Sequence, residues 1–525
     1  MKKILCFVTA ICIALCAAGC KGNNNTDTDS DNSVSNPSNS HISIAYNSTD
    51  SVNPYEAKTD ANRYLSLLLY DPLIKVNNSF EPEYCLAENV KIDGNKCTVT
   101  LVNASFSDGS SLTADDVVYS FNAAKSGNQK YAYILAGIKS AKAVGGSVEF
   151  TADKADPYMA NLLTFPIFKS GSDTQKNQDN VSLPPIGCGR YIYDSAQEQL
   201  TANPNWHGGD LSVKTIRLID APGDEALTHV IDIGAVDIYY TDLHDCNILR
   251  MSGSRMNVEL NNIVYIGVNH DNALLSQNDL RQAISAALNR TKICSDAYFN
   301  NAVPATGFFN PAWNAASGVQ SILLLPNNNI AIENLAKIGY NSRNSDGYAV
   351  NSAGNVLTLR LLVNNENQFR NNAVRLIVNQ LSAVGIKIVL EQVGFDEYKS
   401  RLESKNFDLY LGETQLLDNM DISQLVCAGG SAAYGITETD NTGDKADDSA
   451  DGTDNGDKLT LSAVINGFYG GEYTINDVAA LAVSQMPVIP VCYRTGILFC
   501  SDNIKNCDTA YNGDIYAVIN KLVIN

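Results

Sequence analysis

The residues that most often carry out catalysis are few and scattered in this chain. Its 525 residues include five histidines, His41, His207, His229, His244 and His270. No Gly-x-Ser-x-Gly, His-Glu-x-x-His or phosphate-binding Walker motif occurs, so the patterns that position a nucleophilic serine, a catalytic zinc or a nucleotide are missing. His244-Asp245 is an isolated pair. The sequence predicts a protein that is not an enzyme, and paired carboxylates for glycoside hydrolysis stay an open alternative.

The cysteines do not have the spacing of a metal site. Thirteen are present, of which four lie near the N-terminus: Cys6, Cys12, Cys16 and Cys20. The other nine are an odd number and no Cys-x-x-Cys occurs, so we expect no metal and no cofactor. Most of the nine are predicted to be small buried hydrophobic residues. A disulfide such as Cys85–Cys97 is an alternative that spacing alone does not support.

An acidic segment interrupts the C-terminal half of the chain. Residues 437–458 hold eight acidic side chains among Gly, Asn, Thr and Ser. This composition predicts a solvated, disordered loop. Calcium binding is the alternative, because carboxylates are hard oxygen ligands, but no twelve-residue loop with a closing Glu is present. The calcium ligands would be Asp447, Asp448, Asp451 and Asp454.

The N-terminus has the pattern of an export signal. Lys2 and Lys3 precede an apolar run, Ile4 to Ala18, that is short for a transmembrane helix. The run ends in Ala17-Ala18-Gly19-Cys20, which resembles a bacterial lipobox with Cys20 as the lipidated residue. We predict a signal peptide over 1–20 and a flexible tether over 21–40. The mature protein would then be extracytoplasmic and lipid-anchored, on the outer face or periplasmic side of the cell membrane. An ordinary cleaved signal is the alternative.

Composition sets further limits. The length and the 45% hydrophobic content suffice for two or more domains. No second long apolar run appears, so contact with the membrane is expected through the lipid anchor only. The net charge of −20 argues against a nucleic-acid partner, since phosphate binding requires clustered Lys and Arg.

The pattern of elements predicts an α/β protein. Residues 41–46 alternate as a strand, and Asp279 is expected to cap a helix with apolar residues at helical spacing. A strand at 357–363, a helical stripe at 374–381 and a strand at 386–393 predict a βαβ unit. A short helix at 395–402 and a strand at 407–412 running towards Glu413 follow.

One segment combines local structure with a wider resemblance. From Phe106 to Phe121 the chain has an Asp108-Gly109 turn, then Thr113 as a helix N-cap with Asp116 completing a capping box. The same string resembles the "F-x-D-G-x-x-L-T-A-x-D-V-x-x-S" signature of the extracellular solute-binding protein family 5. These proteins are the dipeptide- and oligopeptide-binding lipoproteins of ABC importers. Further similar segments, including Leu280–Ile284 and Met486–Val491, extend the resemblance from about Ile42 to about Tyr493.

This resemblance implies a fold and a domain plan. The expected fold is α/β and two-lobed, like periplasmic binding proteins (type II, large cluster), with hinge crossovers and a ligand cleft. The first lobe would comprise 41–268 and 486–525, and the second 269–485. The crossovers would be Tyr265–Asn269 and Met486–Val491.

The resemblance also implies where a ligand binds. One candidate segment follows the first strand and contains Tyr46, Asn47 and Ser48. The other contains Gly412, Glu413, Thr414, Gln415, Asp418 and Asp421. In peptide-binding members this second segment offers backbone groups to an extended peptide, and an Asp nearby pairs with its amino terminus. The Trp often found there is replaced around Thr414-Gln415. Turn and cap chemistry is the alternative role for both aspartates.

The resemblance predicts a lipid-anchored, monomeric substrate-binding protein of an ABC importer that delivers di- or oligopeptides to permease subunits. Import of an oligosaccharide or a metallophore is an alternative, as is a peptide-sensing receptor lipoprotein without transport. Of two residues after the second crossover, we expect Tyr493 to be packed and Arg494 to lie at the surface. Contact of both with the ligand cleft is the alternative.

Overall fold

The computed structural model describes residues 41–178, 180, 182–246, 248–319, 325–437, 460–520 and 522–524. Contacts group Asn39–Asn525 into one compact unit. The lipobox with Cys20, the tether and almost all of the acidic segment 437–458, with its calcium alternative, lie outside the described residues. Among the described helices, none has both the length and the apolar character needed to cross a membrane.

A mixed sheet of eleven strands runs through the unit. In sheet order its strands are β17 (Lys387–Val393), β16 (Thr358–Asn364), β18 (Leu409–Gln415), β12 (Ser254–Val268), β19 (Ile489–Cys500), β11 (Ile238–Thr241), β1 (His41–Tyr46), β10 (Thr215–Asp220), β9 (Gln199–Ala202) and β8 (Tyr191–Asp194), with β13 (Ala302–Pro304) also paired to β19. β1 is parallel to β10 and β11, and β16 is parallel to β17 and β18. The predicted βαβ unit is therefore confirmed, with α8 (Gln368–Ala383) between β16 and β17.

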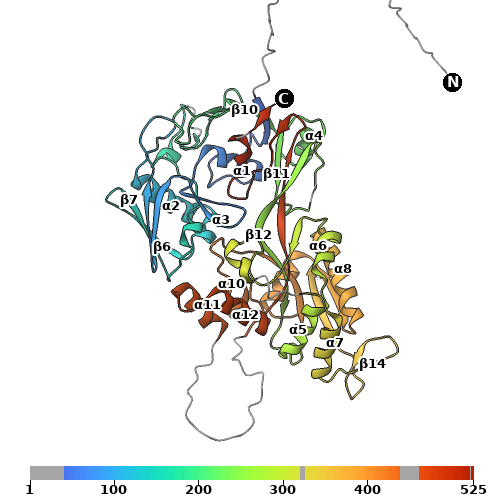
Figure 1. The fold of residues 1–525 in the computed structure, drawn as a ribbon. Helices are drawn as coiled ribbons and strands as arrows, with labels where there is room; N and C mark the ends of the chain where they lie inside the picture. Colours follow the sequence, from blue (N-terminus) through green and yellow to red (C-terminus); the bar gives the residue numbers. More distant parts are fainter. Residues whose placement is uncertain are drawn as a thin grey trace, which may run out of the picture. The chain divides into compact units, whose positions relative to one another are not determined.

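The long strands β12 and β19 join the two ends of this sheet. They pair antiparallel, and Figure 1 shows them running from the part that carries α4 and β11 into the part that carries α5, α6 and α8. Pro490 of β19 has no backbone N–H, and the register shifts between Val264 and Tyr265 opposite it. The sheet continues through both strands without a break, so the lobe boundaries at 268/269 and 485/486 stay a prediction.

A smaller antiparallel sheet forms a separate layer in the N-terminal half. Its strands are β4 (Ala87–Asp93), β5 (Lys96–Leu101), β7 (Ser147–Ala152) and β6 (Ile138–Val144). Helix α2 (Ala114–Gly127) begins with the predicted capping box, in which the Asp116 carboxylate accepts hydrogen bonds from Thr113 N and Oγ1 at 2.9 and 2.6 Å. Asn128 then caps the short helix α3 (Gln129–Ile134). The Asp108–Phe121 segment thus serves as scaffold that positions α3.

The other helices lie around the main sheet. They are α1 (Asp60–Leu69), α4 (Asp224–Asp232), α5 (Asn278–Ala287), α6 (Arg290–Asp296), α7 (Asn328–Lys337), α9 (Phe395–Glu403), α10 (Ser423–Val426), α11 (Leu461–Gly470) and α12 (Ile475–Gln485). Of these, α1, α5, α6 and α9 contact strands of the main sheet. Two expected boundaries were wrong. Helix α5 begins after Gln277, so Asp279 lies in its first turn and not at the cap. Strand β18 continues past Gly412 to Gln415, so Glu413 is part of the strand.

Two large hydrophobic cores pack on the sheet. One gathers side chains of the N-terminal half and the C-terminal segment, such as Ile44, Phe121 and Ile519. The other gathers side chains around α5, α8 and β18, such as Ile284 and Leu411. Most of the nine cysteines after Cys20 are buried, as predicted. These five are Cys97, Cys188, Cys294, Cys492 and Cys500. Cys85 and Cys97 do not pair, and Cys500 forms a disulfide with Cys507.

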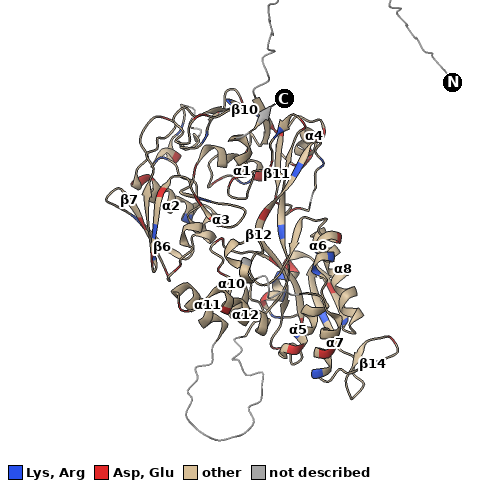
Figure 2. Ribbon diagram, viewed as in Figure 1, with Lys and Arg blue, Asp and Glu red and all other residues tan. Residues whose placement is uncertain are grey.

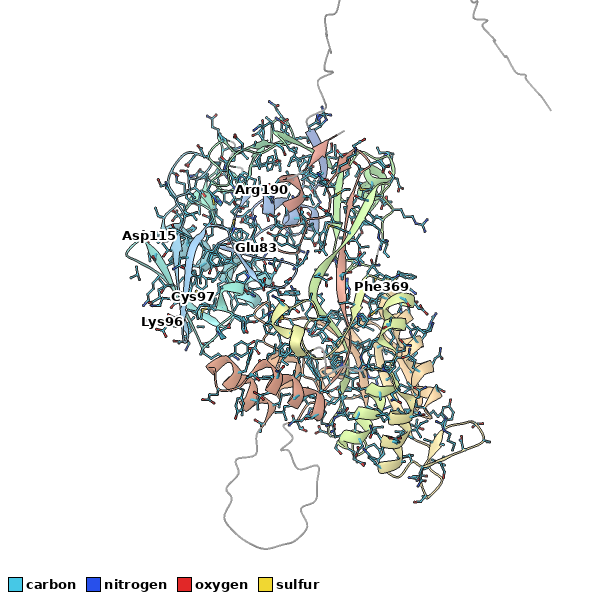
Figure 3. All side chains as sticks on the ribbon, in the orientation of Figure 1. Glu83, Lys96, Cys97, Asp115, Arg190 and Phe369 are labelled. Carbon is cyan, nitrogen blue, oxygen red and sulfur yellow. A yellow bond between two sulfur atoms is a disulfide. The ribbon has the colours of Figure 1, made fainter. Side chains whose placement is uncertain are left out.

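A buried charge network attaches the C-terminal segment to the first core. Arg190 is fully buried, and Figure 3 labels it in the part of the molecule that carries α1. Its Nη2 lies 2.7 Å from Asp514 Oδ1, and Lys75 Nζ lies 2.8 Å from Asp514 Oδ2. Lys75 also lies 3.5 Å from Asp71, which accepts a hydrogen bond from Trp206 Nε1 at 2.8 Å. Burial alone would raise the pKa of Asp514, but the charges of Arg190 and Lys75 outweigh it and lower this pKa.

We expect Asp514→Ala to destabilise the protein by about 3–5 kcal/mol, because removing one partner leaves buried, uncompensated charges on Arg190 and Lys75. Denaturant unfolding monitored by circular dichroism measures this loss. Asp502→Ala, at an exposed position nearby, is the matched control and should change stability by less than about 0.5 kcal/mol. Equal stabilities for the two variants would contradict the structural role of the network.

Candidate functional site

The carboxyl ends of parallel strands mark the candidate site. In an open α/β sheet, ligands bind in the crevice beyond these ends. β1 is parallel to β10 and to β11. Asn47 follows β1, Ala221 follows β10, and Asp242 follows β11. β16 and β18 are parallel as well, and Asp418 follows β18. The sequence thus places polar residues at both sets of strand ends.

The first predicted segment is only partly available to a ligand. Asn47 lines a cavity of about 330 Å³ together with residues of α1, α4 and β11. Tyr46 is buried and its hydroxyl donates to Glu198 Oε1 at 3.1 Å. Ser48 donates from N and Oγ to the Asp220 carboxylate at 2.9 and 2.8 Å. Of the three, Asn47 alone is among the residues that line this cavity.

The second predicted segment divides into paired and unpaired groups. Gly412 packs between the rings of Tyr265 and Tyr410, where an added Cβ would lie 2.8 Å from Tyr265. Glu413 forms an ion pair with Arg494 at 2.6 Å. Thr414 and Gln415 pair with β12. On the other side of β18, pairing with β16 stops at Tyr410, so among the described strands the edge from Leu411 to Gln415 is unpaired there.

Contacts join the loop after β18 to the N-terminal half. Tyr133 of α3 donates to the carbonyl oxygen of Gln415 at 2.9 Å. Lys154 Nζ lies 2.9 Å from Asp421 Oδ2, so this second predicted aspartate is already paired. Two asparagines add hydrogen bonds: Asn161 donates to Asp418 O at 2.9 Å, and Asn419 donates to Asp156 Oδ2 at 2.8 Å. The unit therefore has both halves in contact around the predicted segment.

Asp418 differs from Asp421 because its carboxylate is not fully paired. Its Oδ1 is buried and has no hydrogen-bond partner among the described residues. Burial raises the pKa of Asp418 to about 6, although the positive charge of Lys130 and a side-chain hydrogen bond from Asn261 oppose this shift. The Lys130 side chain is exposed, yet burial by the surrounding protein lowers its pKa. Lys130 therefore lies within electrostatic range of Asp418.

A second charged group, around His244, lies within electrostatic range of Lys130. His244 Nδ1 is 2.8 Å from Asp242 Oδ1 and 3.4 Å from Asp60 Oδ2. The hydrogen bond to Asp242 raises the pKa of His244 to about 9. The negative charges of both aspartates oppose the lowering of the Lys130 pKa by burial, so both aspartates lie within electrostatic range of Lys130. The His244-Asp245 pair in the sequence points to the correct loop, but Asp242 and Asp60 are the carboxylates that contact the imidazole.

Arg494 connects the two sets of strand ends. It is buried, which makes the expected surface position wrong, while Tyr493 is packed as expected. Arg494 Nη1 donates a hydrogen bond to the Glu413 carboxylate, and Arg494 Nη2 donates to the carbonyl oxygen of Asp242. Figure 2 shows basic and acidic positions on the two long central strands. No sequence pattern indicated the contacts of Arg494. None indicated that Lys130 or Asp60 lies near the candidate site.

Solved structures share this fold. Staphylococcus aureus NikA, solved in complex with Ni(L-His)2, is 18% identical, with a TM-score of 0.58 over 92% of this chain and 100% of that chain. The murein tripeptide-binding protein MppA, in an unliganded open form, is 16% identical, with a TM-score of 0.69 over 92% of this chain and 97% of that chain. These likenesses confirm the expected α/β fold of periplasmic solute-binding proteins.

Sequence comparison identifies the family. The oligopeptide-binding protein AppA of Bacillus subtilis is 24% identical over 377 residues, which cover 66% of this chain and 68% of AppA. The family model described as "Bacterial extracellular solute-binding proteins, family 5 Middle" matches residues 81–428, more than half of the chain. The chain therefore belongs to the bacterial extracellular solute-binding proteins of family 5, which bind solutes and are not enzymes.

Proposed function

We propose that this protein is the lipid-anchored, monomeric substrate-binding protein of an ABC importer and captures peptides in the cleft between its two halves. Curated relatives and fold neighbours with this fold include peptide-binding proteins, AppA and MppA among them. The observation that carries the peptide assignment is the carboxylate of the half-buried Asp418, whose Oδ1 is buried and has no hydrogen-bond partner among the described residues. A cationic amino terminus supplies the missing hydrogen bond and charge.

The backbone of β18 supports the same assignment. Beyond Tyr410 one edge of the strand lacks a strand partner among the described residues, although Leu411 O and Gln415 O accept hydrogen bonds from the hydroxyls of Tyr398 and Tyr133. An extended peptide can bind such an edge through its remaining main-chain groups. Tyr133 lies next to this edge, at the carbonyl of Gln415. Asp418 follows three residues later, so the peptide backbone would lie on the strand with its amino terminus at Asp418.

Asp418→Asn should weaken peptide binding by roughly 10- to 100-fold, because a hydrogen bond to a charged group contributes about 1.5–3 kcal/mol. The variant should unfold at the same or a higher temperature, since the buried carboxylate costs free energy. Asp421→Asn is the matched control, because Asp421 is paired with Lys154, and it should retain affinity within about threefold. Isothermal titration calorimetry with a peptide found by native mass spectrometry, using a library of di- to nonapeptides, measures both. Equal losses in the two variants, or no mass shift across the library, would overturn the peptide assignment.

Peptide affinity should fall as the pH drops below about 6. The pKa of Asp418 is raised to about 6 in the free protein, and a bound ammonium group lowers it, so binding requires loss of the proton. Affinity is therefore close to full about one unit above pH 6 and falls by up to about tenfold per pH unit below pH 6. Titrations between pH 4.5 and 7.5 test this, and Asp418→Asn should remove the dependence. A wild-type affinity that is constant over this range would exclude Asp418 as the binding group.

Cys20→Ser should release the protein from membranes. The thiol of Cys20 is the proposed site of diacylglycerol attachment, and two or three acyl chains anchor a protein firmly. Fractionation of cells followed by immunoblotting compares the variant with wild type. Retention of Cys20→Ser in the membrane fraction would refute the lipobox while leaving the peptide proposal intact.

A further inference from the structure

The cluster of Asp60, Asp242 and His244 has the donor set of a metal site. One ligand atom from each residue lies within 4.8 Å of the other two. The donors are one imidazole nitrogen, His244 Nδ1, and one carboxylate oxygen from each aspartate. Imidazole and carboxylate together suit borderline divalent ions such as Zn²⁺ and Ni²⁺.

Neighbouring groups hold these donors in place. Asp60 is the first residue of α1, and Arg63 one turn later binds its other oxygen, Oδ1, at 3.0 Å. This leaves Asp60 Oδ2 directed to His244. The loop after β11 is fixed by Arg494, which donates to the carbonyl of Asp242. Such outer contacts orient metal ligands and increase affinity.

The cluster borders a solvent-connected cavity that is also lined by a residue with an unpartnered polar group. Asp60 and His244 line the cavity of about 330 Å³ that also contains Asn47 on its wall. Tyr240 lines the same cavity, is 5% exposed, and its hydroxyl has no hydrogen-bond partner among the described residues. That hydroxyl packs over Gly496, where a Cβ would lie 2.5 Å from it, and is within electrostatic range of Asp242 and Asp60. It can donate to a ligand group bound beside the cluster.

We propose that Asp60, Asp242 and His244 bind a divalent transition-metal ion of the Zn²⁺ or Ni²⁺ type. Three protein ligands leave at least one coordination position open. This position faces the cavity, where an oxygen or nitrogen donor of the captured solute completes the coordination sphere. The role of the solute rests on the proposed function, whereas metal binding by the protein alone does not.

Three positive charges limit the strength of the site. The pKa of His244 is raised to about 9, so its Nδ1 must lose a proton before it binds a metal ion. Two neighbouring cations add to this effect. Arg63 pairs with Asp60, and Lys130 is within electrostatic range of both aspartates. They repel a divalent ion but also keep the carboxylates ionised. A readily reversible ion is therefore expected, as suits a protein that releases its cargo.

Titration of the untagged mature protein with ZnCl2, NiCl2 and CoCl2, by calorimetry and by the visible absorption of bound Co²⁺, tests this site. We expect one ion per chain, and at least about tenfold weaker binding in His244→Ala and in Asp60→Asn. His229→Ala removes an exposed histidine on α4 and should bind metal like wild type. Thermal unfolding shows whether His244→Ala and Asp60→Asn are folded. The metal affinity of a variant that is folded then tests the site.

Wild-type affinity in a folded site variant, or no saturable binding by wild type, would overturn the metal proposal. Peptide titrations in the presence of EDTA test the metal proposal and the peptide assignment independently of each other. Peptide binding without metal binding contradicts the metal site alone. Metal binding without binding of any peptide contradicts the peptide assignment alone.

Discussion

A buried guanidinium at the centre of the main sheet determines the arrangement around the cleft. Arg494 lies on β19, whose residues are all buried, and an unpaired charge there would cost several kcal/mol. Burial alone would lower the pKa of Arg494, but Glu413 outweighs it and raises this pKa. The pairing fixes the end of β18 through Glu413 and the end of β11 through the carbonyl of Asp242. One side chain thus positions both sets of strand ends.

Some carboxylates near the end of β18 are paired with basic side chains of the protein, and one has an oxygen available to a ligand. Glu413 is committed to Arg494, and Asp421 to Lys154. Asp418 has the same chemistry and lies close by, but one of its oxygens is buried without a partner among the described residues. Because an unpaired buried carboxylate is costly, a group of this kind is retained where a ligand supplies the partner. In the proposed function, Asp418 is the anionic group that pairs with a cation of the ligand, and the exposed Lys130 lies within electrostatic range of it.

Elements governed by neighbouring residues were predictable from the sequence. The capping box of α2, the parallel pair β16 and β17 with α8 between them, and strand β1 depend on local spacing and periodicity, and the structure has all three. The N-cap of α5 was predicted at Asp279 but lies two residues earlier, at Gln277. Helix ends depend on backbone contacts that the side-chain pattern does not determine. Arg494 was expected at the surface because a charged residue is rarely buried, and its partner Glu413 lies 81 residues away.

The sequence by itself determined the family, the α/β fold and the loop after β18 as a candidate site, because these rest on motifs and on short-range hydrophobic patterns. The tertiary structure alone decided which polar groups are paired and which are free. Asp60 meets His244, and Lys130 comes within range of Asp418, across separations that no local pattern records. Ionisation and ligand affinity depend on distance and burial in three dimensions, so they emerge only after the chain has folded.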